Sequence, residues 1–355
     1  MKNGLALALC AMVLFLLSLA FGQSSALPLT QRIALPNVDG RMDHMGIDIA
    51  GQRLFATAFD NHTLSVIDLK AGRQISLIPN LDNPQAAYYD AATNHLFVSA
   101  GGDGSVKMFD GKTFQLLQTI KYSADSDNLR YDAKNKHVIV GYGGEKFIYG
   151  APARQQGDGA MGIMDLAGKK VSEIPTDAHP ESFQLEQMGT RIFINVPDKK
   201  EIQVADLATG KTVAHWPVSC TDNFPMALDD THHRLIVACR EPSALAVFDT
   251  TSGKQVTQVA VDPGLFSDDI FYDPAKSRIY VVARTAAGSD QRAPGPGMLE
   301  IFQQKDPDHY EKVGTQPTGF GAQTGFFSPV LGKLFVAARR QQGGAGGEIL
   351  VYDTK

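Results

Sequence analysis

Carboxylate, amide and imidazole side chains recur through the sequence in short loops that each precede an apolar stretch. Histidine occurs in two of these loops, as His44 and His179. The acidic members of the set are Asp43, Asp127, Glu181, Asp222, Asp268 and Asp269. Oxygen-rich sets suit Ca²⁺ or Mg²⁺, so these residues are candidate ligands for either ion. Two histidines do not favour a zinc or copper cage, and the same side chains could instead line a water-filled channel.

Arginine residues form a second group of candidate binding residues. They follow apolar stretches late in the chain and are Arg240, Arg284, Arg339 and Arg340. Guanidinium groups bind anionic oxygens bidentately, so an arc of them predicts an anionic or hydroxyl-rich small ligand. Carboxylates occupy the corresponding positions earlier in the chain, at Asp60, Asp103 and Asp198. The alternative is that each arginine is solvated or paired with a neighbouring carboxylate.

The elements that must position these residues are short strands in a repeat. Residues 191–261 contain the repeat twice, each time as a strand, a polar turn, a second strand ending in aspartate, a glycine turn and a third strand. The turns at residues 206–211 and 249–254 carry Asp, Gly and Lys at the same positions. Glycine supplies the positive φ of a tight hairpin, and aspartate can bond the turn backbone.

This repeat continues along the chain. The apolar anchor of its second strand falls at Leu54, Leu96, Val138, Ile192, Leu235, Ile279 and Leu334. The steps between these anchors are 42, 42, 54, 43, 44 and 55 residues. Four short strands at a period in the low forties are typical of a β-propeller blade. The sequence therefore predicts an all-β, seven-bladed β-propeller with four-stranded blades, formed by residues 27–355 as a single domain.

The two ends of this domain each supply part of one blade. Residues 30–36 form a strand before the first complete repeat, and residues 348–353 end the last repeat at its third strand. We expect the N-terminal strand to pair with the C-terminal blade and close the ring, which protects the edge strands. Propeller geometry brings the loops before the innermost strands to one mouth of the central channel. The histidines, carboxylates and arginines are therefore expected to gather there.

The N-terminal segment has the features of a secretory signal. Lys2 precedes an apolar run over residues 5–21, and small residues follow, so residues 1–26 are predicted to be a signal peptide. The alternative is an anchor that is retained. We expect a periplasmic or secreted monomer with no membrane span after signal removal. The 33 basic and 38 acidic residues give a net charge of −5, which argues against nucleic acid or an anionic membrane as a general partner.

The cysteines support this compartment. Of the three, Cys10 lies in the predicted signal, which leaves Cys220 and Cys239. Cys220 opens the innermost strand of the fifth blade and Cys239 closes the second strand, so the two should be neighbours in an antiparallel pair. An even number of cysteines in an exported protein favours a disulfide. The alternative is a pair of buried thiols.

Motifs of known catalytic and cofactor sites are absent from the sequence. It contains no Cys-x-x-Cys-His, His-Glu-x-x-His or Gly-x-Ser-x-Gly motif, no P-loop and no dinucleotide-binding glycine motif. The catalytic residues, if any, are therefore undefined. His44 and His179 are the candidates for an acid–base role.

Residues 53–68 resemble the repeat of the YVTN family of β-propellers, which are exported bacterial proteins of the YncE type. Residues 192–211 and 235–249 match the same pattern, although the literal Tyr-Val-Thr-Asn does not occur. The resemblance covers essentially the whole chain after the signal. It implies a seven-bladed periplasmic or cell-surface propeller that binds ligands or partners. It carries over no catalytic residue, because the motif residues are strand core and turn.

Three functions are open at this point. The favoured one is an exported, non-catalytic binding or scaffold propeller for a small polar or anionic ligand or a protein partner. The second is a lactonase, hydrolase or lyase in which Ca²⁺ or Mg²⁺ at the channel mouth acts as a Lewis acid. The third is an accessory subunit of a periplasmic redox enzyme. The fold alone does not choose among them, because propellers carry many unrelated functions.

Overall fold

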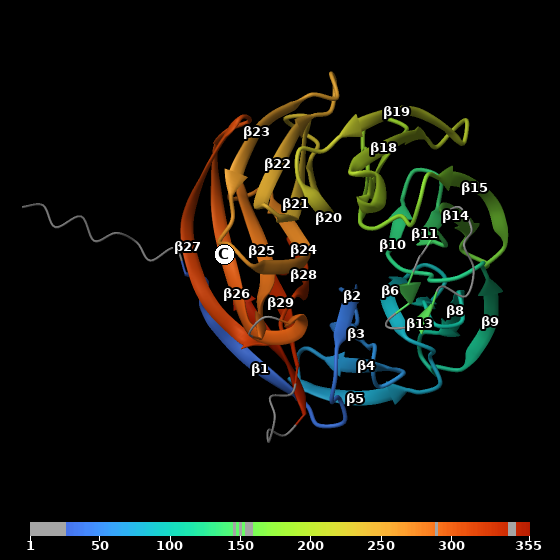
Figure 1. The fold of residues 1–355 in the computed structure, drawn as a ribbon. Coiled ribbons are helices and arrows are strands. Elements are labelled where there is room, and N and C mark those ends of the chain that lie inside the picture. Colours follow the sequence, from blue (N-terminus) through green and yellow to red (C-terminus); the bar gives the residue numbers. More distant parts are fainter. Residues whose placement is uncertain (1–25, 145–146, 149–150, 153–158, 288–289, 340–345) are drawn as a thin grey trace, which may run out of the picture.

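The computed structural model describes residues 26–144, 147–148, 151–152, 159–287, 290–339 and 346–355. All but the last residue of the predicted signal peptide therefore lies outside the described residues. The described chain forms seven four-stranded antiparallel sheets that follow one another around a ring (Figure 1). This confirms the predicted seven-bladed β-propeller.

The first four blades take the chain in order, from the innermost strand to the rim. Blade 1 is β2 (Met42–Asp48), β3 (Arg53–Ala58), β4 (Thr63–Asp68) and β5 (Arg73–Ile78). Blade 2 is β6 (Pro84–Asp90), β7 (His95–Ala100), β8 (Ser105–Asp110) and β9 (Leu116–Lys121). Blade 3 is β10 (Leu129–Asp132), β11 (His137–Tyr142), β14 (Gly159–Asp165) and β15 (Lys170–Thr176). Blade 4 is β16 (Phe183–Leu185), β17 (Arg191–Val196), β18 (Glu201–Asp206) and β19 (Lys211–Pro217).

The remaining blades complete the ring. Blade 5 is β20 (Thr221–Asp229), β21 (Arg234–Glu241), β22 (Ser243–Asp249) and β23 (Gln255–Ala260). Blade 6 is β24 (Leu265–Asp273), β25 (Arg278–Ala287), β26 (Asp290–Asp306) and β27 (His309–Phe320). Blade 7 is β28 (Thr324–Ser328), β29 (Lys333–Ala338), β30 (Gly347–Asp353) and β1 (Leu29–Leu35). Outside the blades lie a two-stranded hairpin, β12 (Phe147–Ile148) with β13 (Ala151–Pro152), and the short 3₁₀ helix η1 (Pro197–Lys199).

The ring closes between the two ends of the chain. Strand β1 pairs antiparallel with β30, with Ile33 opposite Ile349, and becomes the outermost strand of blade 7. This is the closure that the sequence predicts. Because the N-terminal strand covers the edge of the last blade, no open array of blades is left to pair with another chain.

The repeated aspartates act in the turns as expected. Asp206 Oδ1 accepts a hydrogen bond from the Thr209 N–H at 2.8 Å, and Gly210 has a φ of +68°. Asp249 Oδ1 does the same for the Ser252 N–H at 2.7 Å. The left-handed φ at Gly210 is one that residues with a Cβ rarely adopt. Local turn chemistry therefore explains why the hairpins recur.

Apolar side chains pack between neighbouring blades and hold the ring together. Between blades 4 and 5, Trp216 lies 5.4 Å from Phe193 and 6.3 Å from Phe248, measured between ring centroids. The innermost strands approach each other closely. A Cβ on Gly46 of β2 would lie 2.4 Å from the carbonyl oxygen of Ala87 in β6. The scaffold around the channel is thus tightly packed.

Cys220 and Cys239 form a disulfide, with their Cα atoms 6.0 Å apart. This confirms the pair predicted from the sequence. The bond joins the start of β20 to β21, immediately before Arg240. Among the described residues, no helix has the length and apolar character needed to cross a membrane.

Candidate functional site

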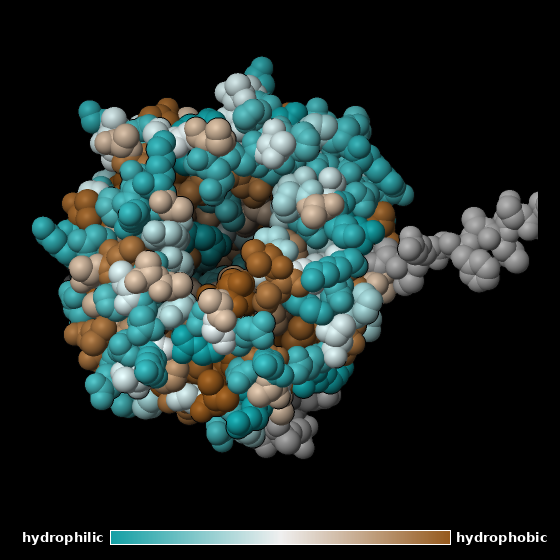
Figure 2. Space-filling model, turned by 180° about the vertical axis from the view of Figure 1, so that it is seen from behind, coloured by the Kyte–Doolittle hydropathy of each residue, from teal (hydrophilic) through white to brown (hydrophobic). Residues whose placement is uncertain are grey.

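A cavity of about 550 Å³ lies where the seven blades meet. It is lined by Arg41, His44, Asp60, Gln85, Asp125, Asp127, Asn128, His179, Glu181, Ser182, Phe224, Arg240, Asp268, Arg284, Gln323 and Arg339. Every blade contributes to this lining, through the loop before its innermost strand or through that strand itself. Blades 1, 5, 6 and 7 also contribute from the end of the second strand. Figure 2 shows the ring hollowed at its centre, with hydrophilic residues deep in the hollow.

The structure brings most of the predicted site residues together. His44, His179, Asp127, Glu181, Asp268, Arg240, Arg284 and Arg339 all line the cavity. Asp43 and Asp269 are buried beside His44. Asp222 does not join them, because its side chain is exposed and outside the lining. Arg340 lies outside the described residues.

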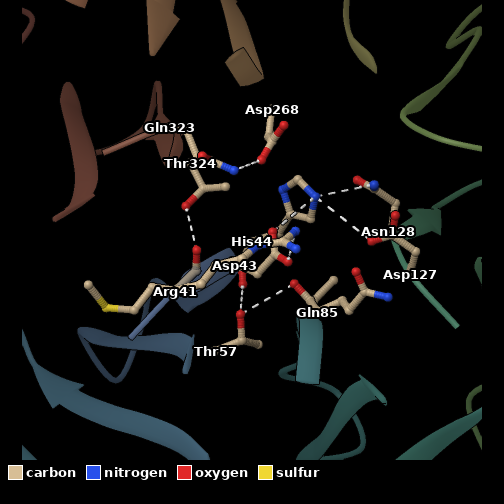
Figure 3. Close-up of polar contacts among 12 residues, drawn as sticks. Arg41, Asp43, His44, Thr57, Gln85, Asp127, Asn128, Asp268, Gln323 and Thr324 are labelled. Carbon is tan, nitrogen blue, oxygen red and sulfur yellow. Dashed lines mark hydrogen bonds and ion pairs between the residues drawn. The ribbon is translucent and has the colours of Figure 1, made fainter. Parts of the chain in front are cut away.

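His44 occupies the centre of a carboxylate cage (Figure 3). Its Nδ1 lies 3.1 Å from Asp269 Oδ2. Its Nε2 lies 3.7 Å from Asp43 Oδ1, 3.9 Å from Asp127 Oδ1 and 3.3 Å from Asn128 Nδ2. The imidazole therefore links innermost strands or loops of blades 1, 3 and 6.

The cage holds His44 in its charged form. Burial lowers the pKa of His44, but Asp269, Asp43 and Asp127 outweigh burial and raise it to about 10. Asn128 Oδ1 is buried without a partner, and turning the carboxamide over would let it accept the Nε2–H of an imidazolium. Burial raises the pKa of Asp43 to about 7, although Arg41 and His44 oppose it. A histidine kept protonated is a poor general base near neutral pH.

The arginines form one wall of the cavity, and aromatic rings brace them. The guanidinium of Arg240 lies 3.7 Å from the ring centroid of Phe224 and forms an ion pair with Asp268. That of Arg284 lies 5.0 Å from the ring centroid of Phe266. Such cation–π contacts are favourable and help to fix the guanidinium groups in place. Sequence reasoning found Arg240 and Arg284 but not Phe224, which belongs to the same loop-to-strand segment as Asp222.

Gln323 and Asp43 accept hydrogen bonds from the other arginines of this wall. Gln323 Oε1 accepts hydrogen bonds from Arg284 Nε and, at 3.3 Å, from Arg339 Nη2. Arg41 Nη2 donates to Asp43 Oδ2 at 2.6 Å. Arg41 was missed in the sequence, although it lies only three residues before His44. Including the two or three residues before each candidate loop residue would have identified Arg41.

Positive charge is crowded on this wall. Burial lowers the pKa of Arg339 to about 10, and the neighbouring Arg41 and Arg284 add to the effect. Asp60 and Asp268 act in the opposite direction without balancing it. A buried guanidinium whose charge is disfavoured by two like charges gains from an anion in the cavity.

Carboxylates and a histidine form the opposite wall. His179 Nδ1 donates to the backbone carbonyl of Gly143 at 2.6 Å. Its Nε2 lies 3.9 Å from Asp127 Oδ2 and 4.0 Å from Asp125 Oδ2. Asp127, His179 and Glu181 each offer a ligand atom within 4.8 Å of the other two. Asp125 was also missed in the sequence, although it lies two residues before Asp127.

The chain is thus a seven-bladed β-propeller with a charged cavity at its centre. No family model matches it, and no curated protein matches it. Solved structures similar to it include the mitotic checkpoint complex, with a TM-score of 0.71 and 12% identity over 99% of this chain and 98% of that one. Another is the hydrazine synthase of Kuenenia stuttgartiensis, with a TM-score of 0.66 and 15% identity over 86% and 93% of the two chains. At these identities the likeness shows the fold alone.

Proposed function

We propose that the protein is an exported, non-catalytic β-propeller that binds a small anionic ligand in its central cavity. The observation that carries this proposal is the crowding of Arg41, Arg284 and Arg339 on one wall of that cavity. The volume of about 550 Å³ falls within the usual range for a small-molecule site. Repulsion among the guanidiniums would be relieved by a carboxylate, sulfate or phosphate group.

The rest of the cavity suggests what else the ligand carries. The wall opposite the arginines presents Asp127, Glu181 and His179. Hydroxyl groups on the ligand would donate hydrogen bonds to these carboxylates while its anionic group faces the arginines. A hydroxy acid or sugar acid has this combination of groups.

Export and family are part of the same proposal. The disulfide is compatible with an oxidising compartment such as the periplasm or the exterior. We take residues 1–26 as the signal peptide and residues 27–355 as the propeller domain, which functions as a monomer. The YVTN-like repeats support membership of the YncE-type propellers.

A second candidate is the metal-assisted hydrolase, lactonase or lyase. It is favoured by the cluster of Asp127, His179 and Glu181, which lies in the same cavity as the arginines. In that arrangement a cation would polarise a carbonyl whose carboxylate is held by the arginines. Turnover of a lactone or ester by the purified protein would distinguish this candidate from pure binding.

The binding proposal is tested with a panel of hydroxy acids, sugar acids and phosphates, each paired with a neutral isostere. Isothermal titration and thermal shift would measure the affinities. We expect anions to bind, their neutral isosteres not to bind, and salt to weaken the affinity. The double variant Arg284→Gln/Arg339→Gln should weaken binding at least about tenfold, since each lost charged hydrogen bond is worth that much.

Arg278 provides the matched control for this variant. Arg278 is the first residue of β25, and Arg284 lies near the other end of the same strand. The Nε of Arg278 donates to Gln303 Oε1 at 3.1 Å, outside the cavity. Arg278→Gln should leave ligand binding unchanged. The proposal fails if no anion binds, or if the double variant and the Arg278→Gln variant bind equally well.

A further inference from the structure

We propose that Asp127, His179 and Glu181 form a binding site for one divalent first-row metal ion, such as Mn²⁺ or Zn²⁺. The site lies on the cavity wall opposite the arginines. It goes beyond the proposed anion binding and does not depend on it, because the cluster is complete without the arginines.

The backbone holds the three ligands in position. Asp127 N–H donates to the Gly141 carbonyl at 2.9 Å, and Glu181 N–H donates to the Asn195 carbonyl at 3.0 Å. Both acceptors are in or beside the second strands of blades 3 and 4. The three ligands therefore come from two adjacent blades of a rigid scaffold, which is the kind of support that a precise metal site needs.

The tautomer of His179 suits a metal ligand. Its Nδ1 carries the proton that is donated to the Gly143 carbonyl at 2.6 Å. In the neutral ring this leaves the lone pair on Nε2, which faces Asp127 Oδ2 at 3.9 Å. Metal-binding histidines are commonly oriented in this way, with the second ring nitrogen bonded to a carbonyl or carboxylate. A metal ion bound by Nε2 would also contact the carboxylate of Asp127, which faces this nitrogen.

Asp127 supplies an independent indication of a missing partner. The residue is only 6% exposed and lines the cavity. Its Oδ1 faces His44 Nε2 at 3.9 Å, which is too far for a hydrogen bond, and is buried without a hydrogen-bond partner. Leaving a buried carboxylate oxygen unsatisfied is unfavourable. A cation bound by this carboxylate would remove that cost.

The ligand set indicates the class of ion. One imidazole and two carboxylates form a mixed nitrogen and oxygen set, which suits first-row divalent ions better than a purely oxygen-binding ion such as Ca²⁺. Three protein ligands also leave coordination positions open toward the cavity. Water or an oxygen of a bound ligand would fill them.

A second cluster in the described chain provides the contrast. Asp177, Glu201 and His215 also place their ligand atoms within 4.8 Å of one another. There His215 Nδ1 lies 2.9 Å from Glu201 Oε1, and both His215 and Asp177 are about half exposed to solvent. A surface ion pair explains this cluster, so it serves as the control.

The experiment uses the chelator-treated protein with no anionic ligand present. Mn²⁺ binding is followed by electron paramagnetic resonance, and Zn²⁺ binding by isothermal titration and by the rise in melting temperature. We expect one saturable ion per chain. Mutating a residue that only hydrogen-bonds to a metal ligand typically weakens metal binding about 10–100-fold. Losing a direct ligand should cost more, so Asp127→Asn and His179→Gln should nearly abolish metal binding. His215→Gln should bind like the unchanged protein.

Glu181→Gln keeps the test decisive if the more buried Asp127→Asn variant does not fold. Each variant's melting temperature in chelator reports folding separately from metal binding. The proposal is overturned if no ion saturates the protein, or if His215→Gln weakens binding as much as His179→Gln. It is also overturned if the ¹⁵N shift of His179 Nε2 shows a protonated nitrogen at saturating metal. None of these results would bear on anion binding by the arginines.

Discussion

His44 and His179 both line the cavity, His44 from the innermost strand β2 and His179 from the loop before the innermost strand β16, yet their surroundings differ. His44 points Nδ1 at the Asp269 carboxylate, 3.1 Å away, and faces two more carboxylates through Nε2. His179 points Nδ1 at a backbone carbonyl, 2.6 Å away. The two imidazoles therefore differ in the group that Nδ1 contacts, which is a carboxylate for His44 and a backbone carbonyl for His179.

This difference decides what each histidine can do. A carboxylate on Nδ1 stabilises the imidazolium, so His44 acts as a buried cation that ties blades together. A carbonyl on Nδ1 fixes the position of one proton without adding charge, and in the neutral tautomer this leaves Nε2 as the nitrogen that would bind the proposed metal ion. The same residue type is thus a structural ion pair in blade 1 and a candidate metal ligand in blade 4.

The largest effect is expected from breaking the His44 cage. Asp269 also accepts the Gly325 N–H at 2.9 Å, so its carboxylate joins blades 1, 6 and 7. Removing one partner of a buried ion pair costs about 3–5 kcal/mol, and Asp269→Asn should lower the free energy of unfolding in urea by that amount. The exposed Asp222 is the control, and Asp222→Asn should stay within about 0.5 kcal/mol. A loss no larger than the control's would mean that the cage does not stabilise the fold.

The same ion pair predicts how stability depends on pH. Carboxylates raise the pKa of His44 from its ordinary value of 6.5 to about 10, despite the opposing effect of burial. The folded state therefore binds this proton more tightly than the unfolded state does. The contribution of this proton to the free energy of unfolding is complete below pH 6.5 and is lost as the pH rises toward about 10. The total loss should not exceed the cost of breaking the cage. Urea titrations across this range should show the decline, and a decline of equal size in Asp269→Asn would contradict the assignment.

The fold could be predicted because its turns depend on residues close together in the sequence, whereas the cage around His44 depends on residues far apart in it. The turns at Asp206 and Asp249 are made by bonds to residues three positions away, so the repeat is visible in the sequence. His44 and Asp269 are 225 residues apart, and only the closed ring brings them together. The sequence therefore identified both residues but not their pairing.

Asp222 shows a second limit of the repeat pattern. It has a φ of +54° and an exposed side chain, whereas the next residue, Asn223, is buried. Asn223 Nδ2 donates to Asn195 Oδ1 at 3.1 Å, inside the ring. In this segment the residue that lines the cavity is Phe224, and neither Asp222 nor Asn223 does so. Spacing alone could not reveal it.

The disulfide offers a perturbation that should affect stability without touching either histidine. It closes a loop of 19 residues in blade 5, between Cys220 and Cys239. The chain-entropy estimate for a loop of this length is about 3 kcal/mol. Reduction should lower the free energy of unfolding by about that amount while leaving the Mn²⁺ affinity at the His179 cluster unchanged. A large change in metal affinity would mean that the two regions are mechanically coupled through the ring.

The smallest effect should come from His179, and it is the most direct comparison with His44. Without metal, His179→Gln removes the hydrogen bond to the Gly143 carbonyl, worth about 0.5–1.5 kcal/mol. His44→Gln instead leaves Asp269 buried without the imidazolium that it faces, at about 3–5 kcal/mol. Added Mn²⁺ should increase the difference in free energy of unfolding between His179→Gln and the unchanged protein, because only the unchanged protein is stabilised by the bound ion. Equal losses for the two variants in chelator would show that His179 is also a buried cation, and its Nε2 would then have no lone pair to offer a metal.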